Sequence, residues 1–341
     1  MKKNILVLGA GGNASRNYVK SLKLDEKYIG NIIGVDINES AEYFSNTDKF
    51  YLLNQNDKLS NIQKIIDIEN IDFVHAQPDK EVYFISENKN YLNAKTIDVD
   101  KKLFQKYSNK EFTNRIWSKS FKTFTSYPYV EVENNKDLFF DCLQKSGKAW
   151  VRLKSGAGSS GALPVNTIKQ LKNWVDYWVE FRNAVKTDFI VSEYLPGKEY
   201  AVQIFYWKGE IYHFQARERI EYFFANQMIS GQSSTPSIAK TVVNEDLQKT
   251  ALKAICDIEP EPHGIYCVDL KENNEQEIIP MEVNYGRFFT TSYFFSALNV
   301  NTPLDVIKKS FGFEISKKIN FLTDDHYCFR GLDMDMKILN K

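Results

Sequence analysis

Short apolar runs alternate with helical patterns over the first third of the chain. The runs lie at residues 4–8, 32–35 and 71–75, each followed closely by glycine or polar residues, while residues 14–24 have a helical pattern. Buried parallel strands separated by crossover helices produce this alternation. Residues 1–96 are therefore predicted to form a small α/β domain with a parallel sheet.

The hydrophobic pattern changes after residue 96. Apolar side chains recur at three- and four-residue intervals between residues 99 and 127, which predicts a helical stretch closed by Pro128. Further on, runs typical of strands dominate. The predicted strands lie at residues 148–153, 189–192, 200–207, 210–214, 264–270 and 277–283, with turns at 208–209 and 273–276 and helices near 168–178, 244–256 and 303–309. The second part of the chain is thus predicted to mix helices and strands.

Charge and composition limit the classes of partner. The chain has 44 basic and 44 acidic residues, so its formal net charge is zero, whereas duplex-binding proteins carry a basic excess. The four cysteines and four histidines are dispersed without metal-binding spacing, which favours a reducing compartment. No apolar run approaches the ~20 residues of a membrane span, and the first run is too short for a signal peptide. We expect a soluble cytoplasmic protein without nucleic acid or membrane as a partner.

A glycine- and serine-rich loop follows the predicted strand at 148–153. The sequence RLKSGAGSSG at residues 152–161 places Arg152 and Lys154 on one face of the strand, because side chains alternate. Glycines let the backbone approach a ligand and expose N–H groups to phosphate oxygens. The loop is predicted to bind phosphate, and a surface hairpin is the competing interpretation. The candidate contacts are Arg152, Lys154, Gly156, Gly158, Ser159, Ser160 and Gly161.

Acidic and amide side chains gather on a predicted hairpin near the C-terminus. If residues 274–277 form the turn, Asp269 lies opposite Glu282, and Glu282 shares a face with Asn284. Oxygen ligands of this kind suit Mg²⁺, which also binds phosphate. Arg287 follows closely and could hold a developing anion. A solvated acidic hairpin is the competing interpretation.

A third segment joins two predicted strands through a polar bend. Residues 191–200, VSEYLPGKEY, are predicted to form a slot for a purine. A backbone carbonyl in residues 193–195 and the Glu193 carboxylate could accept from an adenine amino group, while Glu199 reaches the ribose. The candidate contacts here are Glu193, Tyr194, Leu195 and Glu199.

Taken together, these three segments resemble the ATP-grasp superfamily. Residues 152–161 match that family's [KR]xxxGxGSxG phosphate loop, and residues 193–195 with Glu199 are similar to its hinge. Asp269 and the E-x-N pair of Glu282 and Asn284 are similar to its metal-binding strands. The sequences ISGQS at 229–233 and PDKE at 78–81 resemble the carbamoyl-phosphate synthase large-subunit branch.

The resemblance implies both a fold and an activity. It implies an α/β pre-ATP-grasp domain at 1–96, then an α+β ATP-grasp fold of two lobes at 97–341, with the lid lobe at about 110–190 and the core lobe at about 191–341. It also implies an ATP-dependent ligase with Mg²⁺, or Mn²⁺ in its place. Such a ligase forms an acyl phosphate from a carboxylate, couples it to an amine or similar nucleophile and releases ADP. The substrates would be small molecules, and a homodimer is an alternative to a monomer.

Two residue assignments rest on the same resemblance. Arg287 is expected to stabilise the acyl phosphate, but it stands three positions after Asn284, where the family places arginine two positions after it, following proline. The first cationic ATP contact falls on Lys110 or Arg115, and Lys110 is preferred.

Other hypotheses explain less of the sequence. GAGGNA at residues 9–14 fits GxGxx[GA], and Asp36 ends the next apolar run, so an NAD-dependent oxidoreductase is the main rival. That hypothesis leaves the 152–161 loop and the Glu282 motif unexplained. A nucleotide-binding protein without catalysis and a short carbamoyl-phosphate-synthase-like protein are further alternatives.

Two features receive structural interpretations. His75, at the end of an apolar run, is interpreted as a structural histidine whose hydrogen-bonding groups are satisfied. Arg217, Glu218 and Arg219 are interpreted as a solvated strand edge, with a role in substrate binding as the alternative.

Overall fold

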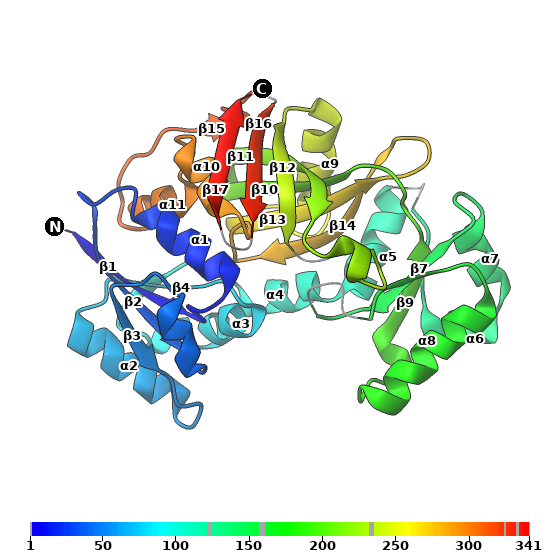
Figure 1. Cartoon of the computed structure of the whole chain (residues 1–341), viewed down its shortest axis with the longest axis horizontal. Coiled ribbons are helices and arrows are strands. Elements are labelled where there is room, and N and C mark those ends of the chain that lie inside the picture. The colour runs from blue at the N-terminus through cyan, green and yellow to red at the C-terminus, as the bar shows by residue number, and fades with distance from the viewer. Residues whose placement is uncertain are drawn as a thin grey trace.

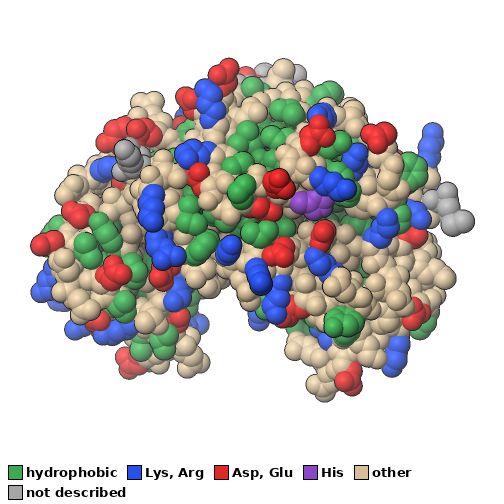
Figure 2. Space-filling model, turned by 180° about the vertical axis from the view of Figure 1, so that it is seen from behind, with side chains coloured by type: hydrophobic (Ala, Val, Ile, Leu, Met, Phe, Trp, Pro, Cys, Tyr) green, Lys and Arg blue, Asp and Glu red, His purple; other side chains and the backbone are tan. Residues whose placement is uncertain are grey.

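The computed structural model describes residues 2–121, 124–156, 161–231, 235–323, 325–331 and 334–340, the last range by its backbone alone. These residues form three sheets arranged as an arch, in which the N-terminal domain and a green lid lobe lie beneath the two ends of a core lobe (Figure 1). Figure 2, from behind, shows a notch between the two lower masses, with acidic and basic side chains interspersed over this face.

The N-terminal domain is built on a five-stranded parallel sheet in the order β3-β2-β1-β4-β5 among the described residues. Its apolar runs are fully buried, as predicted for strands covered by helices on both faces. Helix α1 (Asn13–Leu22) packs against α10 (Ser292–Ala297) and α11 (Thr302–Ser310) of the core lobe, and Asn301 donates to Ser21 O at 2.7 Å across that contact. The elements are β1 (Lys3–Leu8), α1 (Asn13–Leu22), β2 (Ile29–Asp36), η1 (Glu39–Tyr43), β3 (Lys49–Leu52), α2 (Lys58–Glu69), β4 (Phe73–Ala76), α3 (Asp79–Asn88), η2 (Lys89–Tyr91) and β5 (Lys95–Thr96).

Two helices connect this domain to the lid lobe: α4 (Lys101–Ser108) and α5 (Lys110–Ser120). The predicted helical stretch is thus interrupted, because the Asn109 side chain caps α5 by accepting from the backbone N–H groups of Glu111 and Phe112 at 3.1 and 3.2 Å. Trp117 is fully buried, and its indole donates to Ala254 O at 3.0 Å. The linker helices are therefore fixed to the core lobe.

The lid lobe has its own small core, separate from that of the other two parts. Its antiparallel sheet has the order β6-β9-β7-β8, and helix α8 packs Leu171 and Val175 against it, as the helical pattern predicted. The elements are β6 (Ser126–Pro128), α6 (Tyr129–Asn134), α7 (Asp137–Leu143), β7 (Ala149–Leu153), β8 (Leu163–Val165), α8 (Ile168–Phe181), η3 (Lys186–Asp188) and β9 (Phe189–Glu193).

The core lobe contains an eight-stranded sheet in the described residues, with the order β14-β13-β10-β11-β12-β16-β17 and β15 beside β11. The predicted turn at Lys208 and Gly209 is a hairpin in which both residues have positive φ, as in a type I′ turn. The elements are β10 (Glu199–Trp207), β11 (Glu210–Tyr222), η4 (Ala225–Gln227), β12 (Pro236–Val242), α9 (Glu245–Cys256), β13 (Gly264–Glu272), β14 (Ile278–Tyr285), α10 (Ser292–Ala297), α11 (Thr302–Ser310), β15 (Lys318–Ile319), β16 (His326–Gly331) and β17 (Met334–Asn340).

The sequence prediction placed the end of β11 too early. The strand continues from Glu210 to Tyr222 and pairs with β10 on one side and β12 on the other. Arg217, Glu218 and Arg219 therefore lie in the interior of the sheet, and their interpretation as a solvated strand edge is wrong. The predicted class, a parallel α/β domain followed by an α+β region of two lobes, is confirmed, while the predicted domain and lobe boundaries stay predictions.

Candidate active site

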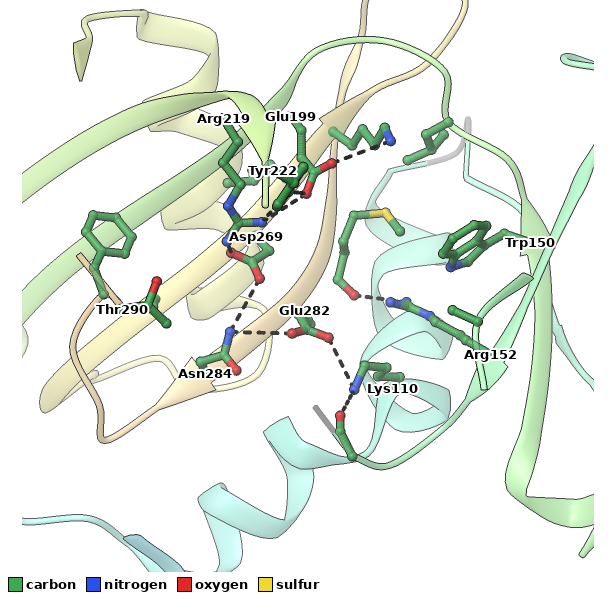
Figure 3. A pocket seen from close by; sticks show the side chains of 18 of the residues that line it. Lys110, Trp150, Arg152, Glu199, Arg219, Tyr222, Asp269, Glu282, Asn284 and Thr290 are labelled. Atoms are coloured by element: carbon green, nitrogen blue, oxygen red, sulfur yellow. Dashed lines mark hydrogen bonds and ion pairs between the residues drawn. The ribbon is translucent and has the colours of Figure 1, made fainter. Parts of the chain in front are cut away.

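One cavity opens where the lid lobe, the linker helix α5 and the core lobe meet (Figure 3). The N-terminal domain contributes Ala14, the residue that follows its glycine turn. Residues lining the cavity include Lys110, Trp150, Arg152, Gly156, Glu193, Tyr194, Leu195, Glu199, Arg217, Arg219, Tyr222, Asp269, Lys271, Met281, Glu282, Asn284, Arg287 and Thr290. Three segments that are far apart in the sequence thus converge on one space.

The floor of the cavity is one face of the core sheet. Strand register aligns polar side chains across neighbouring strands, and alternation turns every second residue to the same face. One row across the sheet consists of Glu282, Asp269, Ala201 and Arg217, and the next consists of Lys271, Glu199 and Arg219. The period-two pattern of four strands therefore concentrates these charges on one surface.

The predicted metal-binding residues lie together. Asp269 pairs with Glu282 in the β13–β14 ladder, as the hairpin argument predicted. The Asn284 Nδ2 atom lies 3.5 Å from an oxygen of each carboxylate, between the two acids. Burial alone would raise the pKa of Glu282, but Lys110, Arg152 and Arg287 outweigh it and lower that pKa to about 2. Glu282 is therefore ionised at neutral pH.

Lys110 joins this acidic pair to the glycine-rich loop. It is the first residue of α5, it is buried, and its Nζ donates to Gly156 O at 2.9 Å and pairs with Glu282 Oε2 at 3.2 Å. Arg115, the alternative first cation, is exposed and stacks over Phe112 instead. Lys110 therefore lines the cavity, and its contact with ATP stays a prediction.

The two cations of the predicted phosphate loop differ in environment. Arg152 is buried, and its Nη2 donates to Met281 O at 3.0 Å, while its Nε has no hydrogen-bond partner in the described part of the chain. Lys154 is partly exposed and lies 3.9 Å from a Glu111 oxygen. Gly156 and Gly161 both have positive φ, which favours glycine. The other predicted contacts, Gly158, Ser159 and Ser160, lie outside the described residues.

The opposite wall of the cavity carries the predicted purine slot. Glu193, at the end of β9, is 2% exposed, and its Oε1 is buried without a hydrogen-bond partner among the described residues. Lys145 approaches the other oxygen at 3.4 Å, yet burial dominates and raises the pKa of Glu193. Tyr194, Leu195 and the Trp150 ring also line this wall. A buried acceptor beside apolar surface suits an aromatic ring with an exocyclic amino group.

Glu199 lines the cavity, but other side chains already bind its carboxylate. Arg219 Nη1 lies 3.0 Å from Oε1, which also accepts from the Tyr222 hydroxyl, and Lys271 lies 3.6 Å from Oε2. Burial alone would raise the pKa of Glu199, but Arg219 and Lys271 outweigh it and lower that pKa. The predicted ribose contact therefore lies at the cavity within an ion-pair network.

Arg217 and Arg219 line the cavity, whereas the sequence interpretation preferred a solvated strand edge and kept a role in substrate binding as the alternative. Arg219 bridges two acids, because its Nη2 also lies 2.6 Å from Asp269 Oδ1. Arg217 is 1% exposed and donates to the Thr291 hydroxyl. A longer strand prediction through residue 222 would have placed both on one face by alternation, and the β10–β11 register places Glu199 opposite Arg219.

The dinucleotide-like turn of the N-terminal domain is closed by its own acid. The Asp36 carboxylate accepts from Gly11 N at 3.0 Å through one oxygen and from Asn38 N at 3.1 Å through the other. A Cβ at Gly11 would lie 2.5 Å from Ala41 Cβ, so glycine is required for the close approach of the two segments. Both oxygens of the acid that a dinucleotide site uses for ribose thus hold the loop together.

Arg287 occupies the far end of the acidic pair. It donates to Asn284 Oδ1 and lies 3.2 Å from Asp79 of the N-terminal domain.

No group of three or more histidine, cysteine, aspartate and glutamate side chains in the described residues could hold a metal ion. Among the same residues, no helix has the length and apolar character to cross a membrane.

No protein-family model matches the sequence, and no curated protein matches it either. Solved structures do. The biotin carboxylase domain of Hydrogenobacter thermophilus 2-oxoglutarate carboxylase, a dimer in complex with MgADP, ADP and bicarbonate, aligns with a TM-score of 0.71 and 13% identity over 96% of this chain and 74% of that chain. N5-carboxyaminoimidazole synthetase from Staphylococcus aureus, complexed with ADP, aligns with a TM-score of 0.63 and 13% identity over 96% of this chain and 82% of that chain.

An L-amino acid ligase from Bacillus licheniformis also aligns, with a TM-score of 0.62 and 11% identity over 91% of this chain and 74% of the other. These structures share with this chain the succession of a parallel α/β domain and two further lobes. The resemblance inferred from the sequence motifs is therefore confirmed at the level of the fold: this chain has the ATP-grasp fold.

Proposed function

We propose that this protein is an ATP-dependent ligase, which activates a carboxylate as an acyl phosphate and couples it to an amine or similar nucleophile, releasing ADP. One observation carries the proposal. Cations from the lid and linker, Lys110 and Arg152, meet Glu282 of the core lobe in one cavity, with a buried unpartnered acceptor, Glu193, on its other wall. This combination suits phosphates, a metal ion and an adenine ring.

ATP would lie between the lid and core lobes. Its adenine would fit against Trp150 and Leu195, and its amino group would donate to Glu193 Oε1, which needs a donor because it is buried. Its phosphates would meet Lys110 and Arg152. The ADP in two of the structures that share the fold, with MgADP in one of them, supports nucleotide binding by this fold.

The residues present fit Mg²⁺. Asp269 and Glu282 supply hard oxygen ligands, and the amide of Asn284 would supply a third if its Oδ1 turned from Arg287 towards the acids. Nδ2 of this amide lies between the two carboxylates, the position a cation would also favour. Phosphate oxygens would complete the ligand set, and the bound ion would offset charge on the phosphates during transfer. Mn²⁺ has the same preferences.

Reaction at this site needs positioning and electrostatics rather than a side-chain nucleophile. The substrate carboxylate attacks the γ-phosphorus of ATP, ADP leaves, and the amine then displaces phosphate from the acyl phosphate. Arg287 has a guanidinium at the end of the acidic pair, where negative charge would develop on the acyl phosphate. The NAD-dependent alternative is not favoured, because structures that share this fold hold ADP.

The experiment is a screen for ADP formation with Mg²⁺, ATP and pairs of small carboxylates and amines. The proposal expects at least one pair in which both components are required. Glu282→Gln should abolish that ADP formation, and Glu111→Gln, which changes a partly exposed acid beside the same loop, should keep it. Formation of ADP that needs no carboxylate would contradict the proposal.

Two further proposals concern the protein in the cell. The four cysteines are unpaired, three of them buried, which supports a cytoplasmic location. A homodimer is proposed from the dimeric biotin carboxylase domain that shares the fold. Sedimentation of the purified chain tests it: a species of twice the 39.6 kDa chain mass supports the dimer, and a monomer at micromolar concentration contradicts it.

A further inference from the structure

A buried positive charge without a counter-ion lies beside the metal-binding pair. In the part of the chain that the structure describes, no acidic side chain forms an ion pair with Arg217; its Nη1 donates to Thr291 Oγ1, and its Nε has no partner. Arg219, two residues on, is neutralised by Glu199 and Asp269. An isolated buried charge is costly. The sheet face therefore carries one cation that the protein itself leaves unneutralised.

The Arg217 guanidinium is held in a fixed position. Its Cζ lies 4.4 Å from the centre of the Phe289 ring, a cation–π contact. The loop that supplies this ring is fixed in turn by two buried glutamines: Gln77 accepts from Phe288 N at 3.1 Å and Gln203 accepts from Phe289 N at 2.8 Å. A cation held in place by both domains can bind an anion with little loss of side-chain entropy.

The space around Arg217 belongs to the non-adenine end of the cavity. Thr290 lines the same cavity, and its buried hydroxyl has no hydrogen-bond partner among the described residues. Figure 3 shows Thr290 beyond Asp269 and Asn284, on the side away from Trp150. In the row of paired residues across the sheet, Ala201 lies between Asp269 and Arg217, and its small side chain leaves room above the sheet at this point.

We propose that Arg217 and Thr290 bind a second carboxylate of a substrate, one that is not activated in the reaction. The guanidinium would offer a planar pair of N–H donors and the threonine a hydroxyl donor, a set that matches a carboxylate. One uncompensated positive charge matches a monoanion better than a phosphate dianion. The ligand class is thus a carboxylate-bearing amine, such as an amino acid, or an acyl substrate with two carboxylates. This inference rests on the proposed function for the order of events, but the binding itself does not require turnover.

The test measures ligand binding by saturation-transfer NMR on the full chain with Mg²⁺ and a non-hydrolysable ATP analogue. The probes are a mixture of L-amino acids, the matching amino-acid amides, which lack the carboxylate, and a mixture of small dicarboxylic acids. The variants are Arg217→Gln, Arg217→Lys and the control Arg182→Gln, at an exposed arginine of the lid lobe. Nucleotide affinity is measured on each variant by calorimetry.

The proposal expects signals from amino acids or from dicarboxylic acids and none from the amides. Arg217→Gln should weaken that binding about 10- to 100-fold, the loss typical of a charged hydrogen bond, while nucleotide affinity stays within about twofold. If only the amino acids bind, the carboxylate held by Arg217 belongs to the amine substrate. If only the dicarboxylic acids bind, that carboxylate belongs to the acyl substrate. Amides that bind as well as acids, or no binding by either acid mixture, would overturn the proposal.

Arg217→Lys keeps the inference testable if the glutamine variant loses nucleotide binding. Lysine preserves the charge but not the planar fork, so acid binding should weaken less than in the glutamine variant and more than in Arg182→Gln. Acid binding equal to that of the control would overturn the proposal. A wild type that binds carboxylates through Arg217 yet forms ADP with no substrate pair would contradict the ligase proposal alone.

Discussion

His75 provides a quantitative test of the packing between the N-terminal domain and the loop after β14. The side chain is 2% exposed, and its Nε2 has no hydrogen-bond partner among the described residues. The centre of its ring lies 4.1 Å from that of Tyr18 and 5.1 Å from that of Phe288. The interpretation of a satisfied histidine is therefore wrong for this nitrogen. Burial lowers the pKa of His75 from 6.5 to about 3. The folded protein thus holds a neutral imidazole that the unfolded chain protonates more readily.

The sign and size of the pH effect follow from that difference. Below pH 6.5 the unfolded state takes up a proton that the folded state refuses, so stability is lost as pH falls from 6.5 towards 3. Each pKa unit corresponds to about 1.4 kcal/mol, so acidification from pH 7.5 to 5 should remove about 2 kcal/mol through His75 alone. His75→Phe keeps an aromatic ring between Tyr18 and Phe288 and removes the titrating group.

The measurement is urea unfolding of both proteins at pH 7.5, 6 and 5, with His326→Phe as the control for loss of a histidine elsewhere. The free energy of unfolding of the wild type should fall by about 2 kcal/mol more than that of His75→Phe between pH 7.5 and 5. Equal pH dependence in the two proteins would refute the reasoning, since it would mean that a proton enters the folded site without cost.

Three further predictions concern separate parts of the molecule. Lys110→Met should weaken Mg²⁺-dependent binding of an ATP analogue by at least tenfold in calorimetry, because it removes the cation between Gly156 and Glu282. Gly11→Ala should cost about 1–3 kcal/mol in thermal unfolding through its 2.5 Å approach to Ala41, whereas Gly12→Ala, with nothing nearer than 3.7 Å, should cost much less. Glu111→Gln should change stability by less than about 1 kcal/mol, because its ion pair with Lys154 is 3.9 Å long and partly exposed.

The sequence predicted most where local pattern and chemistry coincide. Asp269 and Glu282 were placed opposite each other by counting from a predicted turn, and the register agrees because strand alternation leaves no freedom once the turn is known. Helix α8 was predicted near residues 168–178 from apolar side chains that recur on one face, and that face packs against the sheet of the lid lobe. Lys110 was preferred over Arg115 by resemblance alone; the structure shows it buried beside Glu282, and its role as the ATP contact stays a prediction.

Other parts depended on contacts that no local pattern reveals. Arg217 and Arg219 look like surface residues in the sequence, yet they lie inside a sheet because β12 pairs with the outer side of β11. Glu199 is bound by Arg219 and Lys271, which come from the two neighbouring strands, 20 and 72 positions away in the sequence. The unpartnered nitrogen of His75 depends on Tyr18 and Phe288, which belong to different domains. Such features are set by tertiary packing.

The central claim is that nucleotide binds with Mg²⁺ between the lid and core lobes, and calorimetric titration tests it most directly. The protein is titrated with a non-hydrolysable ATP analogue with and without Mg²⁺, with NADH in parallel, and the series is repeated on Glu282→Ala. The account predicts Mg²⁺-dependent binding of the analogue that weakens strongly in the variant. Binding of NADH without any response to the ATP analogue would contradict it and place the active site at the Gly9 turn.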